Sequence, residues 1–165
     1  ETPSAAITLT RTPRKGLNMR LANGNFQHAA ELDAVRNWYK KGVTTIEAVR
    51  SQTYVPGSVR DVENYAAIVE GYVDIPADGV YEFSTNNTEF WIDGVKLIDN
   101  DDDPIKRQTR ANAQRALAKG LHPIKVVFLG GIYSGYPTYW NDGKVNYRTP
   151  GEKWKAIDAS MLFRK

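Results

Sequence analysis

The stretch GYVDIPADGVYEFSTNNTEFWIDGVKLID, residues 71–99, decides the fold of this protein. Apolar and polar side chains alternate along its first part, so that Val73 and Ile75 face away from their polar neighbours. The alternation is interrupted at residues 76–79, Pro-Ala-Asp-Gly, and at residues 93–94, Asp-Gly, where glycine supplies the positive φ that tight hairpin turns require. This pattern predicts successive antiparallel strands, and therefore an all-β protein.

The length and composition predict one folded unit. A chain of 165 residues is long enough to bury a two-layer core, and we expect residues 1–165 to form a single domain. The absence of cysteine excludes disulfides, thiolate metal sites and a cysteine nucleophile. No run approaches the ~20 apolar residues that a membrane span needs. Because the chain begins at Glu1 rather than at methionine, we expect it to be a segment of a longer protein.

Charged side chains are distributed unevenly along the chain, whose net charge is +3. Residues 61–105 are strongly acidic, whereas residues 1–60 and 106–165 are basic. The basic side chains are spaced singly along predicted strands, unlike the clusters of a nucleic-acid site. We therefore expect acidic and basic segments to pair within one fold, and we expect no nucleic-acid partner. Binding of DNA through the basic ends would instead show a steep salt dependence.

Further strands are expected on both sides of residues 71–99, separated by turn residues. They are residues 5–10, 16–21, 44–49, 65–75, 106–119, 122–129 and 154–163. Residues 28–41 have a helical composition, with a short strand plus loop as the alternative, and residues 51–64 and 130–144 are expected to be loops. Short strands at this spacing predict an antiparallel β-sandwich or barrel. The predicted core consists of Val73, Ile75, Tyr81, Phe83, Phe90, Ile92, Leu97, Ile124, Val126, Phe128, Ile157 and Leu162.

The order of four motifs, GYVDIPADGVYEF, FWIDGVKLID, LAKGLHPIKVVF and YRTPGEKWKAIDASML, resembles the protective-antigen-type domain (the PA-fourteen domain). The matching positions are Gly71, Pro76, Gly79, Tyr81, Phe83, Ile92, Asp93, Gly94, Asp99, Leu117, Gly120, His122, Ile124, Pro150, Gly151 and Ile157. The resemblance covers nearly the whole chain. It implies a β-sandwich of the protective-antigen type, which occurs as a module attached to glycosidases, adhesins and toxins.

One further segment narrows what the resemblance implies. Residues 11–26, RTPRKGLNMRLANGNF, are similar to the entry of such domains where they follow the catalytic domain of bacterial β-N-acetylhexosaminidases. The implied function is a non-catalytic accessory module, carbohydrate-binding or structural, of a bacterial glycoside hydrolase of that type. Its partners would be a glycan, the catalytic domain of the parent chain or both, in a periplasmic, cell-surface or secreted location. A calcium-dependent lectin or adhesin domain is the alternative.

An acidic run is the candidate metal site, and its carboxylates are Asp99, Asp101, Asp102 and Asp103. Their spacing repeats the opening of a calcium loop, but proline and arginine stand where that loop needs glycine and a bidentate glutamate. An EF-hand is therefore excluded, while an irregular calcium site and a solvated acidic loop both remain open. We expect no other cofactor.

The resemblance also implies where calcium-dependent lectins of this type hold their metal, on adjacent aspartates between the strands that end at Phe83 and begin before Ile92. This chain has Asn86 and Asn87 in that loop. Uncharged carboxamides are poor ligands for calcium, which prefers carboxylate oxygens. The departure argues against a calcium-lectin mechanism and leaves the two asparagines as candidate carbohydrate-binding residues.

The loop YSGYPTYWND, residues 133–142, is the main candidate carbohydrate site. Sugars need aromatic faces for their C–H groups and amides or carboxylates for their hydroxyls, and exposed aromatic side chains in a loop often mark binding. The candidates are Tyr133, Tyr136, Tyr139, Trp140, Asn141 and Asp142. The loop could instead pack its own aromatic rings or dock on a neighbouring catalytic domain.

The sequence predicts no catalytic residues in this chain. Glycosidases need two carboxylates directed into one cleft, whereas the acidic side chains here fall on the turns of a small sandwich. Neither His28 nor His122 has serine or aspartate partners at a recognisable spacing. His122 matches a structural position of the family pattern, and we expect it to be a hydrogen-bonded strand residue.

Overall fold

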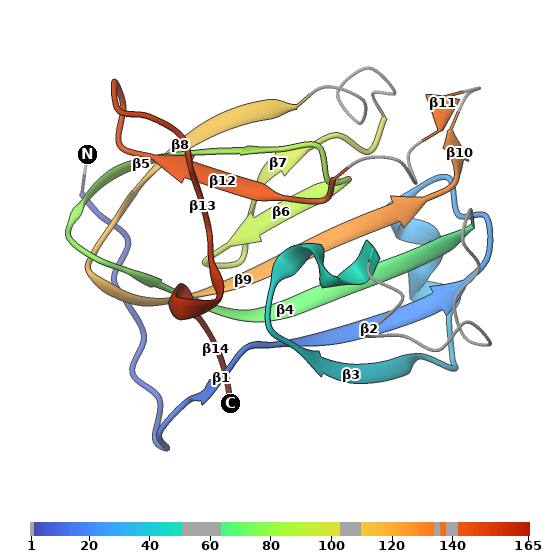
Figure 1. The fold of residues 1–165 in the computed structure, drawn as a ribbon, viewed down its shortest axis with the longest axis horizontal. Helices are drawn as coiled ribbons and strands as arrows, with labels where there is room; N and C mark the ends of the chain where they lie inside the picture. The colour runs from blue at the N-terminus through green and yellow to red at the C-terminus, as the bar shows by residue number, and fades with distance from the viewer. Residues whose placement is uncertain (1, 51–63, 103–109, 134–135, 138–141) are drawn as a thin grey trace.

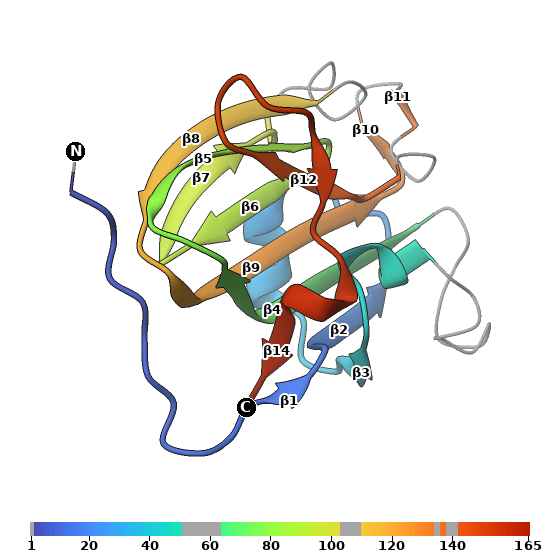
Figure 2. The same ribbon diagram turned by 60° about the vertical axis from the view of Figure 1, so that its left-hand side comes forward.

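The computed structural model describes residues 2–50, 64–102, 110–133, 136–137 and 142–165, and it confirms the all-β prediction. The strands of the larger sheet are β1 (Arg14–Lys15), β2 (Leu17–Asn23), β3 (Tyr39–Val43), β4 (Tyr65–Ile75), β6 (Glu89–Ile92), β7 (Val95–Asp99), β9 (Gly120–Gly130) and β14 (Leu162–Arg164). The smaller sheet contains β5 (Gly79–Thr85), β8 (Ala111–Leu117), β12 (Val145–Arg148) and β13 (Lys155–Ala156). Figures 1 and 2 show the smaller sheet stacked on the larger one.

Three short 3-10 helices and a two-strand pair complete the described elements: η1 (Ala29–Ala34), η2 (Ile46–Arg50), η3 (Ala159–Met161), β10 (Ile132–Tyr133) and β11 (Tyr136–Pro137). All of the strand pairs are antiparallel, and the longest ladder joins β4 to β9, from Tyr65 opposite Gly130 to Ile75 opposite Gly120. None of the helices in the described residues is long and apolar enough to cross a membrane.

The core lies between the two sheets and contains eleven of the twelve predicted residues. Leu97 is the exception, because it is only partly buried while its neighbour Ile98 is buried. The pairing of β6 with β7 shifts its register between Phe90 and Trp91. Since a shift of one residue exchanges the two faces of a strand, this irregularity turns Ile98 inward in place of Leu97.

A second apolar cluster covers part of the outer face of the larger sheet. Leu32 of η1 packs with Ala66, Ile68, Val127 and Leu129, which point outward from β4 and β9. This cover explains why β4 is buried on both faces over its first half, whereas its second half alternates as the sequence predicts.

Two predicted strands are wrong. Residues 5–10 make one isolated bridge, Ile7 with Leu121, and the preceding Ser4 makes another with Leu117. The segment therefore passes from the end of β8 to the start of β9 instead of following either strand. Residues 44–49 instead enter η2, where Ile46 and Val49 are both buried. Apolar residues spaced by three share a face in a helical turn, which explains why the alternation was misleading.

Two other segments are only partly as predicted. Residues 28–41 form η1 followed by the start of β3, and so combine the helix with the strand alternative. Residues 154–163 do not form one strand, because the chain leaves β13 in one sheet, turns through η3 and enters β14 in the other. The predicted strand at 106–119 is confirmed for residues 111–117, which form β8. Its first four positions, 106–109, lie outside the described residues. The predicted loop at 51–64 lies outside the described residues except for its last position.

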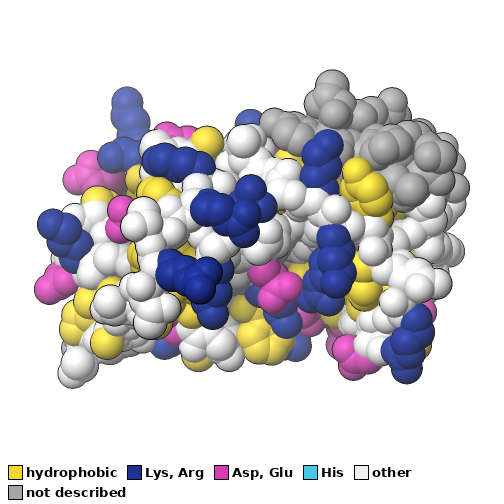
Figure 3. All heavy atoms as spheres, turned by 90° about the horizontal axis from the view of Figure 1, so that it is seen from below, with side chains coloured by type: hydrophobic (Ala, Val, Ile, Leu, Met, Phe, Trp, Pro, Cys, Tyr) yellow, Lys and Arg dark blue, Asp and Glu magenta, His cyan; other side chains and the backbone are white. Residues whose placement is uncertain are grey.

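Charges of the acidic middle segment pair with basic neighbours, as expected. Examples are Glu70 with Arg20 at 2.8 Å and Glu82 with Arg148 at 2.6 Å. On the face of the molecule drawn in Figure 3, Lys and Arg side chains are spread over the surface with acidic side chains among them.

Candidate functional site

Three segments meet at one end of the sandwich, which we call the loop end (Figure 1). They are residues 84–88, from the end of β5 to the start of β6, residues 100–102 after β7, and residues 142–144 before β12. The amide of Asn100 donates to the carbonyl of Thr88 at 2.8 Å. The hydroxyl of Thr85 donates to the carbonyl of Lys144, also at 2.8 Å. These hydrogen bonds join the first segment to each of the other two.

Asn86 and Asn87 lie inside the loop end. Asn87 is 1% exposed, and its carboxamide nitrogen donates to the hydroxyl of Thr85 at 2.9 Å and to the carbonyl of Gly143 at 2.7 Å. Within the described residues, the Oδ1 atoms of both asparagines are buried without a hydrogen-bond partner. The side chain of Asn87 thus ties two segments together, and neither asparagine is presented at the surface.

Arg110 places a positive charge beside these segments. Its Nη2 atom contacts both carboxylate oxygens of Asp142, at 2.9 and 2.7 Å. Its Nη1 atom donates to the carbonyls of Lys144, at 3.1 Å, and Ser84, at 3.5 Å. Asp142 also accepts the amide of Lys144 at 2.9 Å. The candidate sugar ligand Asp142 is therefore a half-exposed carboxylate that is held in place by Arg110.

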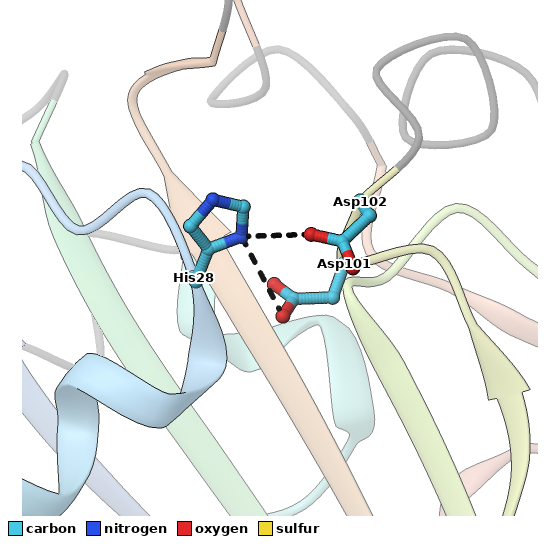
Figure 4. A group of neighbouring side chains, drawn as sticks. All are labelled: His28, Asp101 and Asp102. Carbon is cyan, nitrogen blue, oxygen red and sulfur yellow. Dashed lines mark ion pairs between the residues drawn. The ribbon is translucent and has the colours of Figure 1, made fainter.

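The carboxylates of the acidic run diverge. Asp99 accepts the amide of Asp101 at 3.0 Å and pairs with Lys96 at 3.2 Å. The hydrogen bond to Asp99 is the main cause that raises the pKa of Lys96 above its usual value. Asp101 and Asp102 instead face His28 (Figure 4), while Asp103 lies outside the described residues. Of the three described carboxylates, Asp101 and Asp102 therefore share a partner in His28, whereas Asp99 pairs with Lys96.

His28 is a partner of the acidic run that no sequence motif predicts. Its Nδ1 atom lies 3.2 Å from Asp102 and 3.7 Å from Asp101. Nothing local in the sequence relates residue 28 to residues 101–102, because only the folding of η1 against the larger sheet brings them together.

Residues 13–154 match the family described as the PA14 domain. The chain belongs to the PA14 domain family. This confirms the resemblance and, with it, the antiparallel sandwich expected for the chain.

A β-hexosaminidase of Porphyromonas gingivalis (strain ATCC BAA-308 / W83) is 44% identical over 153 residues. The match covers 92% of this PA14 domain and 20% of that protein, so the chain spans one fifth of its curated relative.

Two solved structures share the fold at low identity. The PA14 domain of the antifreeze protein MpAFP has a TM-score of 0.65 at 12% identity, with 96% of this chain and 95% of that one covered. The A domain of epithelial adhesin 9 from Candida glabrata, solved in complex with Galb1-3GlcNAc, has a TM-score of 0.62 at 11% identity, with 98% and 94% covered. At these identities the likeness establishes the fold of the PA14 domain and nothing further.

The donor set of this PA14 domain does not fit the calcium ion that the lectin resemblance implies between β5 and β6. Calcium takes six to eight oxygens and favours carboxylates. Here the two adjacent positions are carboxamides, and the carboxylate of Asp142 is paired with the guanidinium of Arg110. The guanidinium of Arg110 donates to oxygens of Ser84, Asp142 and Lys144.

The aromatic loop of this PA14 domain is described only in part. Tyr133 in β10 and Tyr136 in β11 are cross-strand neighbours. Tyr139, Trp140 and Asn141 lie outside the described residues. A short antiparallel pair therefore stands within the predicted loop, and it places the backbones of two candidate tyrosines opposite each other.

His122 is the hydrogen-bonded strand residue that the sequence predicts. It is fully buried in β9, with Nδ1 2.9 Å from Asp93 and Nε2 2.7 Å from the carbonyl of Ala118. The contacts join the turn between β6 and β7 to the turn between β8 and β9. Because both ring nitrogens are engaged and no surface is exposed, His122 acts in packing and not in proton transfer to a ligand.

Proposed function

We propose that this PA14 domain is a non-catalytic accessory module of a glycoside hydrolase of the β-N-acetylhexosaminidase type, and that it binds carbohydrate at the loop end. One observation carries the proposal: 44% identity over 92% of the chain, to one fifth of a β-hexosaminidase. A match of this extent is what a module appended to a catalytic region gives. In this proposal residues 1–165 are one domain of a longer, exported protein.

The geometry of the loop end supports carbohydrate as the ligand. Residues 133–142 supply three tyrosines and a tryptophan, and they end at Asp142, which Arg110 orients. Aromatic side chains and a carboxylate are the two kinds of group that bind a sugar ring. The adhesin domain that was solved with a disaccharide has the same fold, which makes such binding compatible with this sandwich.

The described surface pockets do not favour glycosidase chemistry. Two adjoining pockets of about 530 and 240 Å³ on the larger sheet share Glu70, the one carboxylate among their lining residues. Glu70 pairs with Arg20. Since glycosidases use two carboxylates across one cleft, we expect the purified chain to cleave no aryl glycoside. Measurable turnover by the pure chain would contradict the accessory role.

A calorimetric titration with β1-4-linked N-acetylglucosamine oligosaccharides tests the proposal. We expect binding that Trp140→Ala weakens by about tenfold or less, because a stacked ring contributes on the order of 1 kcal/mol. Trp154→Ala is the matched control, since Trp154 stacks on Arg148 at the other end of β12. Binding should persist in a chelator, whereas its loss would favour the calcium-dependent lectin.

The second candidate function is docking on the catalytic domain, which the partial match to a β-hexosaminidase also favours. It predicts that the chain binds the separately produced catalytic part of the Porphyromonas gingivalis relative, and that it binds none of these oligosaccharides. That combination of results would replace carbohydrate binding by a structural role.

A further inference from the structure

Three metal-ligating side chains converge from two distant segments. His28 precedes η1, and Asp101 and Asp102 follow β7. One donor atom from each side chain lies within 4.8 Å of the other two. Figure 4 shows the imidazole edge directed at both carboxylates.

The separations of these donor atoms suit a small metal ion. Charge-assisted hydrogen bonds between nitrogen and oxygen are about 2.7–2.9 Å long. The distances from Nδ1 of His28, 3.2 Å to Asp102 and 3.7 Å to Asp101, are longer. Metal–ligand bonds of about 2.0–2.1 Å in a tetrahedron place neighbouring donors about 3.4 Å apart. The two distances lie on either side of that value.

Contacts from outside the trio position two of its members. The amide of Ala29 donates to Oδ1 of Asp101 at 3.1 Å, while Oδ2 of Asp101 is the oxygen facing His28. The backbone amide of His28 donates to the carboxylate of Glu31 at 2.6 Å. Such supporting hydrogen bonds orient ligands before a metal arrives and so reduce the cost of ordering them on binding.

We propose that His28, Asp101 and Asp102 bind a divalent transition-metal ion of the zinc type, with water completing its coordination. An imidazole combined with two carboxylates suits zinc, cobalt or nickel, whereas calcium favours an all-oxygen shell. The bound ion would link the start of η1, which packs on the outer face of the larger sheet, to residues 101–102 of the loop end. The site uses none of the candidate carbohydrate-binding residues, and its test does not depend on carbohydrate binding.

Calorimetric titration of the chelator-treated chain with zinc chloride tests this assignment. We expect one site, at least tenfold weaker in His28→Ala and in Asp101→Asn. Asp74→Asn is the matched control, because it removes an exposed carboxylate on β4 and should leave zinc affinity unchanged. Far-UV circular dichroism establishes that each variant is folded, and His28→Gln provides a second variant that keeps a polar side chain.

A spectroscopic measurement locates the ion. The chain has two histidines and no cysteine, and His122 is fully buried. Zinc should therefore shift the imidazole ¹⁵N resonances of His28 and leave those of His122 in place, and cobalt should produce the visible absorption of a tetrahedral centre. Equal zinc affinity in the wild type and both His28 variants would overturn the assignment. So would binding of calcium in preference to zinc, or no zinc binding at millimolar concentration.

Discussion

At the scale of single residues, the buried side chain of His122 joins two turns. Its Nε2 atom lies 2.7 Å from the carbonyl of Ala118, and its Nδ1 atom lies 2.9 Å from the carboxyl group of Asp93. Arg115 contacts the same carboxyl group at 3.5 Å. Asp93 has a φ of 55°, a left-handed conformation that aspartate and asparagine tolerate better than most residues.

Replacing Asp93 with Asn tests the importance of these contacts. Asparagine keeps the shape and the backbone conformation, but it replaces the carboxyl group that contacts both His122 and Arg115 by a neutral carboxamide. We expect a loss of about 2–3 kcal/mol in the free energy of unfolding, measured with urea. The exposed Asp74→Asn should change it by less than about 0.5 kcal/mol. Equal midpoints for the two variants would show that the buried pair contributes little.

Arg110 provides the second prediction at this scale. Its guanidinium bonds to residues of two loop segments, and its pair with Asp142 is partly exposed. A double-mutant cycle of Arg110→Gln and Asp142→Asn should therefore give a coupling of about 1 kcal/mol in unfolding free energy.

Calcium should leave the melting temperature of the wild type unchanged, because Asp142 is already paired with Arg110. A rise in melting temperature on adding calcium would mean that carboxylates other than Asp142 bind the ion at the loop end.

At the scale of elements, Gly71 marks the point on β4 where one neighbour replaces another. β2 pairs with β4 up to Glu70, and β14 pairs with it from Tyr72 onward. A Cβ atom at Gly71 would lie 2.5 Å from the carbonyl oxygen of Phe163 and 2.5 Å from Leu17. The position on β4 where the paired strand changes from β2 to β14 therefore requires glycine.

Gly71→Ala should destabilise the protein by about 1–3 kcal/mol, because backbone and core must move to admit the methyl group. Gly79→Ala is the matched control, since its nearest neighbour, a ring atom of Tyr81, is 4.0 Å from the added Cβ. Denaturant midpoints compare the two. If Gly79→Ala lowered the stability more than Gly71→Ala, the backbone around residue 71 would be able to move and accommodate the added methyl group.

At the scale of the whole molecule, the open question is whether the aromatic loop faces a ligand or the protein. Trp140→Ala separates the outcomes without a known ligand. An exposed stacking surface predicts a nearly unchanged melting temperature, whereas a buried indole predicts a loss of about 3–5 kcal/mol. We expect the first result. A large fall in melting temperature would remove this loop from the carbohydrate site, and Trp154→Ala again serves as the control.

What the sequence determined by itself is the set of features with a local physical cause. The alternation around Val73 and Ile75 and the turn residues at 76–79 and 93–94 predict β4 to β7, because strand periodicity and turn propensity depend on neighbouring residues. Of the two turn glycines, Gly94 has the expected positive φ and Gly79 does not. Most of the core followed, since burial repeats with the same period. The family resemblance rests on the same residues, and the comparison with the PA14 domain confirms it.

The tertiary structure alone decided the features that depend on distant partners. The irregular pairing of β6 with β7 exchanges Leu97 for Ile98, and residues 5–10 contact the sheets only through the single bridge of Ile7 with Leu121. The same holds at the loop end, where Arg110 meets Asp142 and His28 meets Asp101. Such contacts arise only when strands far apart in the chain are packed together, and no periodicity in a single segment specifies them.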